Sequence, residues 1–150
     1  MTSELIFYLM TWAAFYTNYP LPDEAPTVQI VEHAWFVETL CDGKDGRRNP
    51  CSVRGAYDDA EPDIIRINRK YYTEMTSDWE GVLMHEMTHY LQKKSGMWEN
   101  MDAWGDEILC LERIDREVEA DNTQREFMHD VHNEYLGKRQ KRWLDRCARK

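Results

Sequence analysis

Glycine and proline are scarce in this chain of 150 residues, which holds seven of the first and five of the second. Such a low content excludes a collagen-like repeat, a proline-rich linker and a low-complexity disordered chain. The length and the 42% of hydrophobic residues are typical of one globular unit that builds its own core. We therefore expect a single domain over residues 1–150.

Apolar segments long enough to cross a membrane are lacking as well. The apolar run Leu5–Tyr16 is too short to span a bilayer. It has no basic residues before it and no small-residue cleavage site after it, as a secretion signal would have. We expect a buried first helix that ends before Asn18, no membrane span and a soluble chain.

None of the four cysteines belongs to a C-x-x-C pair, which argues against a zinc ribbon and against a thioredoxin-type redox site. Cys41 and Cys51 flank a polar segment, so a disulfide between them would close a loop in an oxidising compartment. The chain is expected in the cytoplasm if these residues are thiols. It is expected outside the cell if they are paired or if a leader has been removed.

The charge is negative overall and unevenly placed. The chain has 28 acidic and 19 basic residues, and its tail, residues 138–150, has seven basic residues and one acidic residue. The tail is therefore +6, and the first 137 residues carry 12 − 27 = −15. An acidic body disfavours nucleic-acid binding, which needs a basic surface. We expect the tail to pair with this body, contact with phosphate or a partner being the alternative.

The hydrophobic pattern predicts an α+β fold. Strands are expected where β-branched residues gather, over residues 27–31, 52–57 and 63–68, and the last two are close enough to form a hairpin. A short helix over Ala34–Leu40 separates the first strand from the others. From residue 77 onward the apolar residues recur every three or four positions, which indicates helices.

The helix after the hairpin has clear ends. Ser77 and Glu80 fit the S-x-x-E capping box at its start, and Gly96 is a natural stop. One apolar stripe predicts its buried face: Trp79, Leu83, Met87, Tyr90 and Leu91. Further helical spacing continues through Ile108, Leu111, Ile114 and Val118, and again through Met128, Val131 and Tyr135.

This helix carries an H-E-x-x-H motif at residues 85–89. Two histidines four positions apart project from one face of a helix, so His85 and His89 can bind the same zinc ion. Glu86 lies close enough to act on a metal-bound water without being a ligand. The motif therefore predicts a catalytic zinc site with Glu86 as the general base.

A catalytic zinc site needs a third protein ligand. The metzincin pattern would place glycine and histidine where this chain has Gln92 and Ser95, so that class is excluded. Glu117 and Asp121 lie one helical turn apart downstream. Glu117 could bind the metal while Asp121 accepts the outer N–H of a ligand histidine. Ala120 between them would let two helices approach closely.

Other carboxylates remain candidates for the third ligand. The spacing of thermolysin-like enzymes falls on Leu109, with Glu107 and Glu112 as the nearest acids. Glu112 is therefore the second candidate after Glu117. Glu119 points to the opposite side of the helix from Glu117 and is disfavoured.

The two motifs together resemble a known group of enzymes. HEMTH at residues 85–89 and EVEAD at residues 117–121 look like the H-E-x-x-H and E-x-x-A-[DN] motifs of gluzincin metallopeptidases, which include the CAAX prenyl protease and ImmA/IrrE-type families. The stretch from Cys51 to Gln124 also resembles small zincin-like domains of bacteria and phages. The prenyl proteases have transmembrane helices that this chain lacks, so their substrates are not carried over.

The resemblance implies a minimal zincin-like fold, with a small sheet or hairpin before the active-site helix and a helical C-terminal half. It implies Zn²⁺ as the cofactor. It also assigns the site residues: His85, His89 and Glu117 as ligands, Glu86 as general base and Asp121 as the residue that orients a ligand histidine.

These assignments predict a zinc metallopeptidase in which Glu86 activates a zinc-bound water against a peptide carbonyl. A protein or peptide substrate is expected to add as a strand along the edge of Ile64–Asn68. The candidates for a further donor to the oxyanion are Tyr90, His129, His132 and Tyr135. The alternative is a noncatalytic zincin-fold module for binding or regulation, linked to DNA or another partner through the basic tail.

Overall fold

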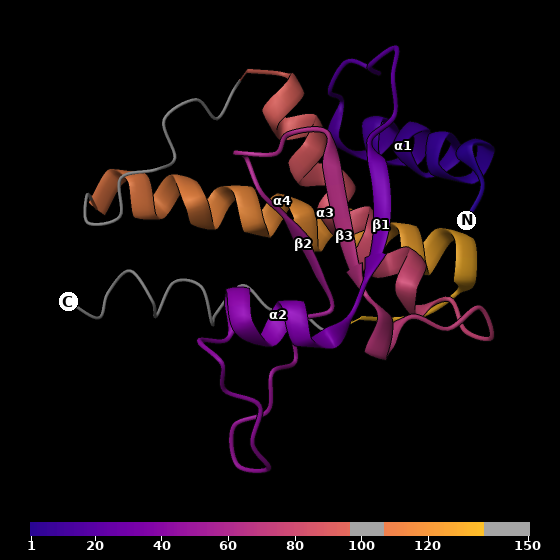
Figure 1. Cartoon of the computed structure of the whole chain (residues 1–150). Helices are drawn as coiled ribbons and strands as arrows, with labels where there is room; N and C mark the ends of the chain where they lie inside the picture. Colours follow the sequence, from indigo (N-terminus) through magenta and orange to yellow (C-terminus); the bar gives the residue numbers. More distant parts are fainter. Residues whose placement is uncertain (97–106, 137–150) are drawn as a thin grey trace.

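The computed structural model describes residues 1–96 and 107–136 and has the predicted α+β class (Figure 1). The basic tail at residues 138–150 and its expected contacts lie outside the described residues. In chain order the elements are α1 (Ser3–Thr17), β1 (Thr27–Val31), α2 (His33–Leu40), β2 (Gly55–Tyr57), β3 (Ile64–Asn68), the short 3-10 helix η1 (Arg69–Tyr71), α3 (Asp78–Lys94) and α4 (Glu107–His132).

The three strands form one sheet in the order β1-β3-β2. β2 and β3 pair antiparallel, which confirms the predicted hairpin, and β1 pairs parallel to β3. The expectation that Ile64–Asn68 offers a free edge is wrong, because β3 is the central strand and has a neighbour on each side. β2, the other strand of the hairpin, lies at an edge of this sheet instead.

The predicted first helix is present as α1. Its start is capped by Thr2, whose Oγ1 accepts a hydrogen bond from the backbone N–H of Leu5. Asn18 ends the helix in the left-handed conformation at φ 58°. The inner face of α1 is buried and packs on α3 and α4. The first helix is thus part of the core around the H-E-x-x-H helix.

α3 begins after Ser77 and ends before Gly96, which adopts φ 72°, as the sequence predicts. All five members of the predicted stripe are buried: Trp79, Leu83, Met87, Tyr90 and Leu91. The helix packs on the sheet, on α1 and on α4, so it lies at the centre of the fold (Figure 1).

The predicted capping box at the start of α3 is wrong in its contacts. The side chain of Ser77 makes no cap hydrogen bond and donates instead to Glu134, with an Oγ–Oε1 distance of 2.7 Å. The carboxylate of Glu80 pairs with His132 rather than returning to the cap. Both side chains bond to residues at or just after the end of α4, and these bonds join the start of α3 to the end of α4.

α4 is one continuous helix of 26 residues along α3. Ala120 is fully buried, in agreement with a close helix approach, and a Cβ at Gly81 of α3 would lie 3.0 Å from Sδ of Met128. The predicted helical spacing from Ile108 to Val118, and through Met128 and Val131, falls within α4, whereas Tyr135 lies beyond the helix and is exposed. Leu111 is 46% exposed, so α4 faces solvent at this position.

Cys41 and Cys51 form a disulfide, with their Cα atoms 5.8 Å apart. Inside the closed loop, the carboxylate of Asp45 accepts a hydrogen bond from the backbone N–H of Cys51 and contacts His33 of α2. The loop that leads into β2 is therefore fixed at both ends. No helix among the described residues is long and apolar enough to span a membrane.

Candidate metal centre

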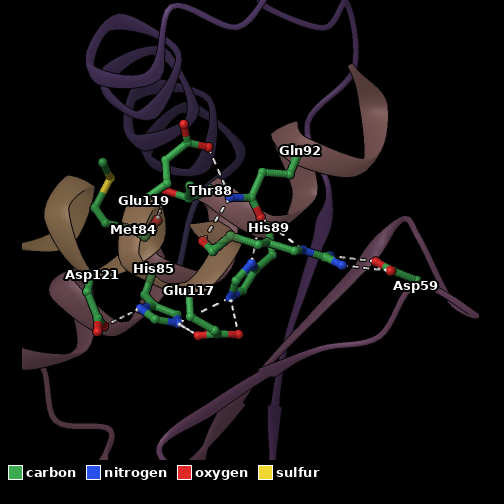
Figure 2. Close-up of polar contacts among 10 residues, drawn as sticks. Asp59, Met84, His85, Thr88, His89, Gln92, Glu117, Glu119 and Asp121 are labelled. Carbon is green, nitrogen blue, oxygen red and sulfur yellow. Dashed lines mark hydrogen bonds and ion pairs between the residues drawn. The ribbon is translucent and has the colours of Figure 1, made fainter. Parts of the chain in front are cut away.

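Two helices bring the three predicted ligands to one point (Figure 2). His85 and His89 come from adjacent turns of α3, and Glu117 comes from α4. One ligand atom from each residue lies within 4.8 Å of the other two. Of the residues that the structure describes, these are the ones grouped closely enough to hold a metal ion.

The two imidazoles stand at the spacing of ligands of a tetrahedral zinc ion, and each lies beside a different oxygen of Glu117. Nε2 of His85 lies 3.1 Å from Oε2 of Glu117, and Nε2 of His89 lies 3.2 Å from Oε1 of Glu117. The two Nε2 atoms are 3.2 Å apart. Ligand atoms that bind zinc tetrahedrally at about 2.0–2.1 Å stand about 3.3 Å from one another. The donor set of two imidazoles and one carboxylate is also that of catalytic zinc sites.

Each histidine has an outer partner for its second ring nitrogen. Nδ1 of His85 donates to Oδ1 of Asp121 at 3.1 Å, and Nδ1 of His89 donates to Oε1 of Gln92 at 2.8 Å. Outer partners of this kind leave the Nε2 lone pairs for a metal. The structure thus places Asp121 beside His85, where the sequence predicted an outer partner, and adds Gln92.

Gln92 belongs to a network that the sequence did not predict. Its amide also accepts from Nε of Arg116, and the guanidinium of Arg116 donates to both carboxylate oxygens of Asp59. Gln92 lies three residues after His89 on the same helix, and this spacing was a usable signal. Arg116 and Asp59 are 57 positions apart, and nothing in the sequence links them.

Charge is concentrated at the ligand cluster. Burial disfavours the charged form of His85, but hydrogen bonds to Asp121 and Glu117 outweigh burial and raise the pKa of His85 to about 10. Burial likewise opposes ionisation of Glu117, yet His89 and His85 hold the pKa of its carboxyl well below the ordinary value. Metal binding at these atoms must displace a proton, so it is expected to strengthen with pH.

Glu86 follows His85 on α3 and is buried against the hairpin. Loss of water around its carboxyl raises the pKa of Glu86, although the two histidines oppose the shift. A carboxyl whose pKa lies above the ordinary value can take up a proton at neutral pH more readily than an exposed one. The direction of this pKa shift therefore suits Glu86 to proton transfer beside the ligand cluster.

The other carboxylates considered as third ligand lie elsewhere. Glu112 is exposed. Glu119 faces away from the cluster, as predicted, and accepts hydrogen bonds from Gln92 and from the hydroxyl of Tyr19. The side chain of Glu107 is outside the described residues.

The four residues considered as oxyanion donors have other partners. The hydroxyl of Tyr90 donates to the backbone carbonyl of Glu24, and His132 pairs with Glu80. His129 and Tyr135 are exposed and contact one another. The structure therefore does not bring these candidates to the ligand cluster.

No family model matches the chain, and neither a curated protein nor a solved structure shows significant similarity to it. The likeness to gluzincins thus rests on the two motifs and on the arrangement of their residues.

Proposed function

We propose that the protein is a zinc-dependent metallopeptidase that cleaves peptide bonds in a protein or peptide. The observation that carries the proposal is the meeting of His85, His89 and Glu117 at zinc-ligand spacing beside a buried Glu86. The two histidines and Glu117 would hold the ion. When bound, zinc supplies Lewis acidity to water and to a substrate carbonyl.

The proton in this reaction would be moved by Glu86. A carboxylate oxygen of Glu86 takes a proton from the attacking water and then delivers it to the nitrogen of the leaving amine. Asp121 and Gln92 hold the rings of His85 and His89 during this transfer, because each accepts an Nδ1 hydrogen bond. Burial between α3 and the hairpin keeps bulk water from the Glu86 carboxyl.

An extended peptide would dock along β2. The backbone N–H of Asn68 donates to the carbonyl of Arg54, and the antiparallel register pairs Ala56 with Arg66. Because hydrogen-bonded pairs alternate in such a ladder, the peptide groups of Gly55 and Tyr57 point away from β3. This edge lies next to Glu86 and offers main-chain groups to a substrate strand.

The decisive experiment compares the wild type with Glu86→Gln, which keeps the size of the side chain but removes the base. We expect about one zinc per chain in both proteins by elemental analysis. Cleavage of an unfolded protein substrate should fall by about 10²- to 10⁴-fold in the variant. A wild type without zinc, or a variant with full activity, would contradict the proposal.

A noncatalytic module for binding or regulation is the competing function. With or without a bound metal, it would cleave no substrate, and Glu86→Gln would then behave as the wild type does. The presence of Glu86 beside the first ligand favours catalysis, because a binding module needs no general base.

We also infer that the protein acts in an oxidising compartment, since a disulfide such as Cys41–Cys51 persists there. Alkylation of the protein in its source cells, followed by mass spectrometry, tests this. Alkylated Cys41 and Cys51 would contradict it.

A further inference from the structure

The side-chain amide of Gln92 is buried and has four hydrogen-bond partners. Its Oε1 accepts from Nδ1 of His89 at 2.8 Å and from Nε of Arg116 at 2.9 Å. Its Nε2 donates to the backbone carbonyl of Arg116 and to the carboxylate of Glu119, both at 2.9 Å. Figure 2 shows Gln92 between His89 and Glu119.

These partners permit one orientation of the amide. An arginine Nε–H can only donate, whereas a carbonyl and a carboxylate can only accept. Rotating the Gln92 amide by half a turn would set its NH₂ group against Nε of Arg116 and its oxygen against Glu119. With Oε1 fixed toward His89, that ring must carry a proton on Nδ1, and Nε2 is the nitrogen that faces Glu117 and is left for a metal.

Arg116 is itself held in place. Its NH1 and NH2 groups donate to the two oxygens of Asp59 at 2.8 and 2.7 Å, and its side chain is 11% exposed. Asp59 lies in the turn that follows β2, and Arg116 directly precedes the ligand Glu117 on α4. A paired guanidinium in this position points its Nε–H at Gln92 and keeps its charge.

We propose that Arg116, anchored by Asp59, is a positioning residue that selects the ring nitrogen through which His89 binds the metal. This inference rests on the proposed zinc site. His85 needs no such device, because both oxygens of its partner Asp121 are acceptors. The Gln92 amide has a donor on one side and an acceptor on the other, so a further residue is needed to fix which of them faces His89.

The first test is zinc affinity, measured by competition with a chromophoric chelator. Loss of an outer partner lowers metal affinity by about 10- to 100-fold, and we expect this for Arg116→Gln. Asp59→Asn should cause a smaller loss, since Arg116 remains. The matched control is Asp63→Asn, which removes another aspartate from the β2–β3 connection whose partner, Lys94, is also a cation. It should bind zinc as the wild type does.

The second test reads the rings directly through long-range ¹H–¹⁵N correlation spectra of the zinc-loaded protein. We expect wild-type His89 to bind through Nε2 with its proton on Nδ1. Arg116→Gln should give a second His89 form or a displaced Nε2 signal, while His85 stays unchanged as an internal reference. A general loss of structure would instead disturb both rings. If Arg116→Gln fails to fold, Asp59→Asn carries the same comparison.

The two proposals fail in different ways. If Arg116→Gln and Asp59→Asn match Asp63→Asn in zinc affinity and in the His89 spectrum, the positioning role is overturned and the zinc site stands. If the wild type binds no zinc, the metallopeptidase proposal falls, and the positioning role falls with it.

Discussion

The backbone of Gly55 on β2 lies directly against the side chain of Glu86 on α3. A Cβ at Gly55 would be 3.0 Å from Cγ and 3.1 Å from Oε1 of Glu86. It would also be 2.7 Å from Cγ1 of Val82, a distance at which the Val82 side chain or the backbone of Gly55 must shift. The position of the Glu86 carboxyl thus depends on having glycine, which has no Cβ, at position 55.

Substitution of Gly55 by alanine should therefore impair catalysis while leaving the zinc ligands in place. Overpacking of this kind costs about 1–3 kcal/mol of stability, and Glu86 is one of the groups that must yield. A base displaced by about 1 Å is expected to lower kcat by about 10- to 100-fold. Zinc content and peptide cleavage, measured on the same preparation, check the prediction.

Gly46→Ala is the matched control, because a Cβ there would meet nothing within 4 Å. It should cleave the substrate at the wild-type rate. Full activity in Gly55→Ala would show that the hairpin adapts and that this contact does not place the base.

Replacing Glu117 by alanine should remove a zinc ligand. The chain would keep only the two histidines, so zinc affinity should fall by more than the roughly 10- to 100-fold expected for an outer partner. The same substitution at Glu112, an exposed residue of the same helix, should leave zinc affinity unchanged. Equal affinities of the Glu117 variant and the wild type would contradict the ligand assignment.

Much of the site could be predicted because its spacing is local. His85 and His89 are one turn apart within a single helix, so their common face follows from helix geometry alone. Glu117 and Asp121 repeat this relation on α4. The C-terminal end of α3 could likewise be predicted, because Gly96 ends the helix through its own backbone conformation.

The remaining features depend on tertiary contacts. The hairpin was predicted, but the central place of β3 follows from its pairing with β1, which lies more than thirty residues earlier. Ser77 fits a capping box, yet its hydroxyl donates to Glu134, which lies just after the end of α4. The pair of Arg116 and Asp59 has no local signature at all. Sequence reasoning therefore reached the ligands and Asp121 but not the network behind His89.

Loss of the disulfide should destabilise the protein. Cys41 and Cys51 are ten positions apart, and closing a loop of this length contributes about 2–3 kcal/mol in the chain-entropy account. Urea unfolding of the Cys41→Ser/Cys51→Ser variant should show this loss relative to the oxidised wild type. The reduced wild type should match the variant. An unchanged midpoint of unfolding would mean that the closed loop adds nothing to stability.

The ion pair of Asp59 with Arg116 should make stability depend on pH. Hydrogen bonds from Arg116 lower the pKa of the Asp59 carboxyl in the folded protein, although burial opposes the shift. The unfolded chain has the ordinary value of about 3.9. The stabilisation is therefore fully present above that value and is lost as the pH falls through the lower, folded pKa.

Urea unfolding with a chelator present, at several pH values between 7 and 3, tests this dependence on the metal-free protein. At pH 7 the free energy of unfolding should be about 1.5–3 kcal/mol larger for the wild type than for Asp59→Asn, which is the usual contribution of hydrogen bonds to a charged group. The difference should persist to about pH 5 and shrink below about pH 4, because the Asp59 carboxyl then takes up a proton in the unfolded wild type, where its pKa is higher than in the folded protein. The other acidic residues are present in both proteins, so their contributions to the pH dependence cancel in the difference. A difference that stays constant down to pH 3 would mean that the Asp59 charge does not hold Arg116.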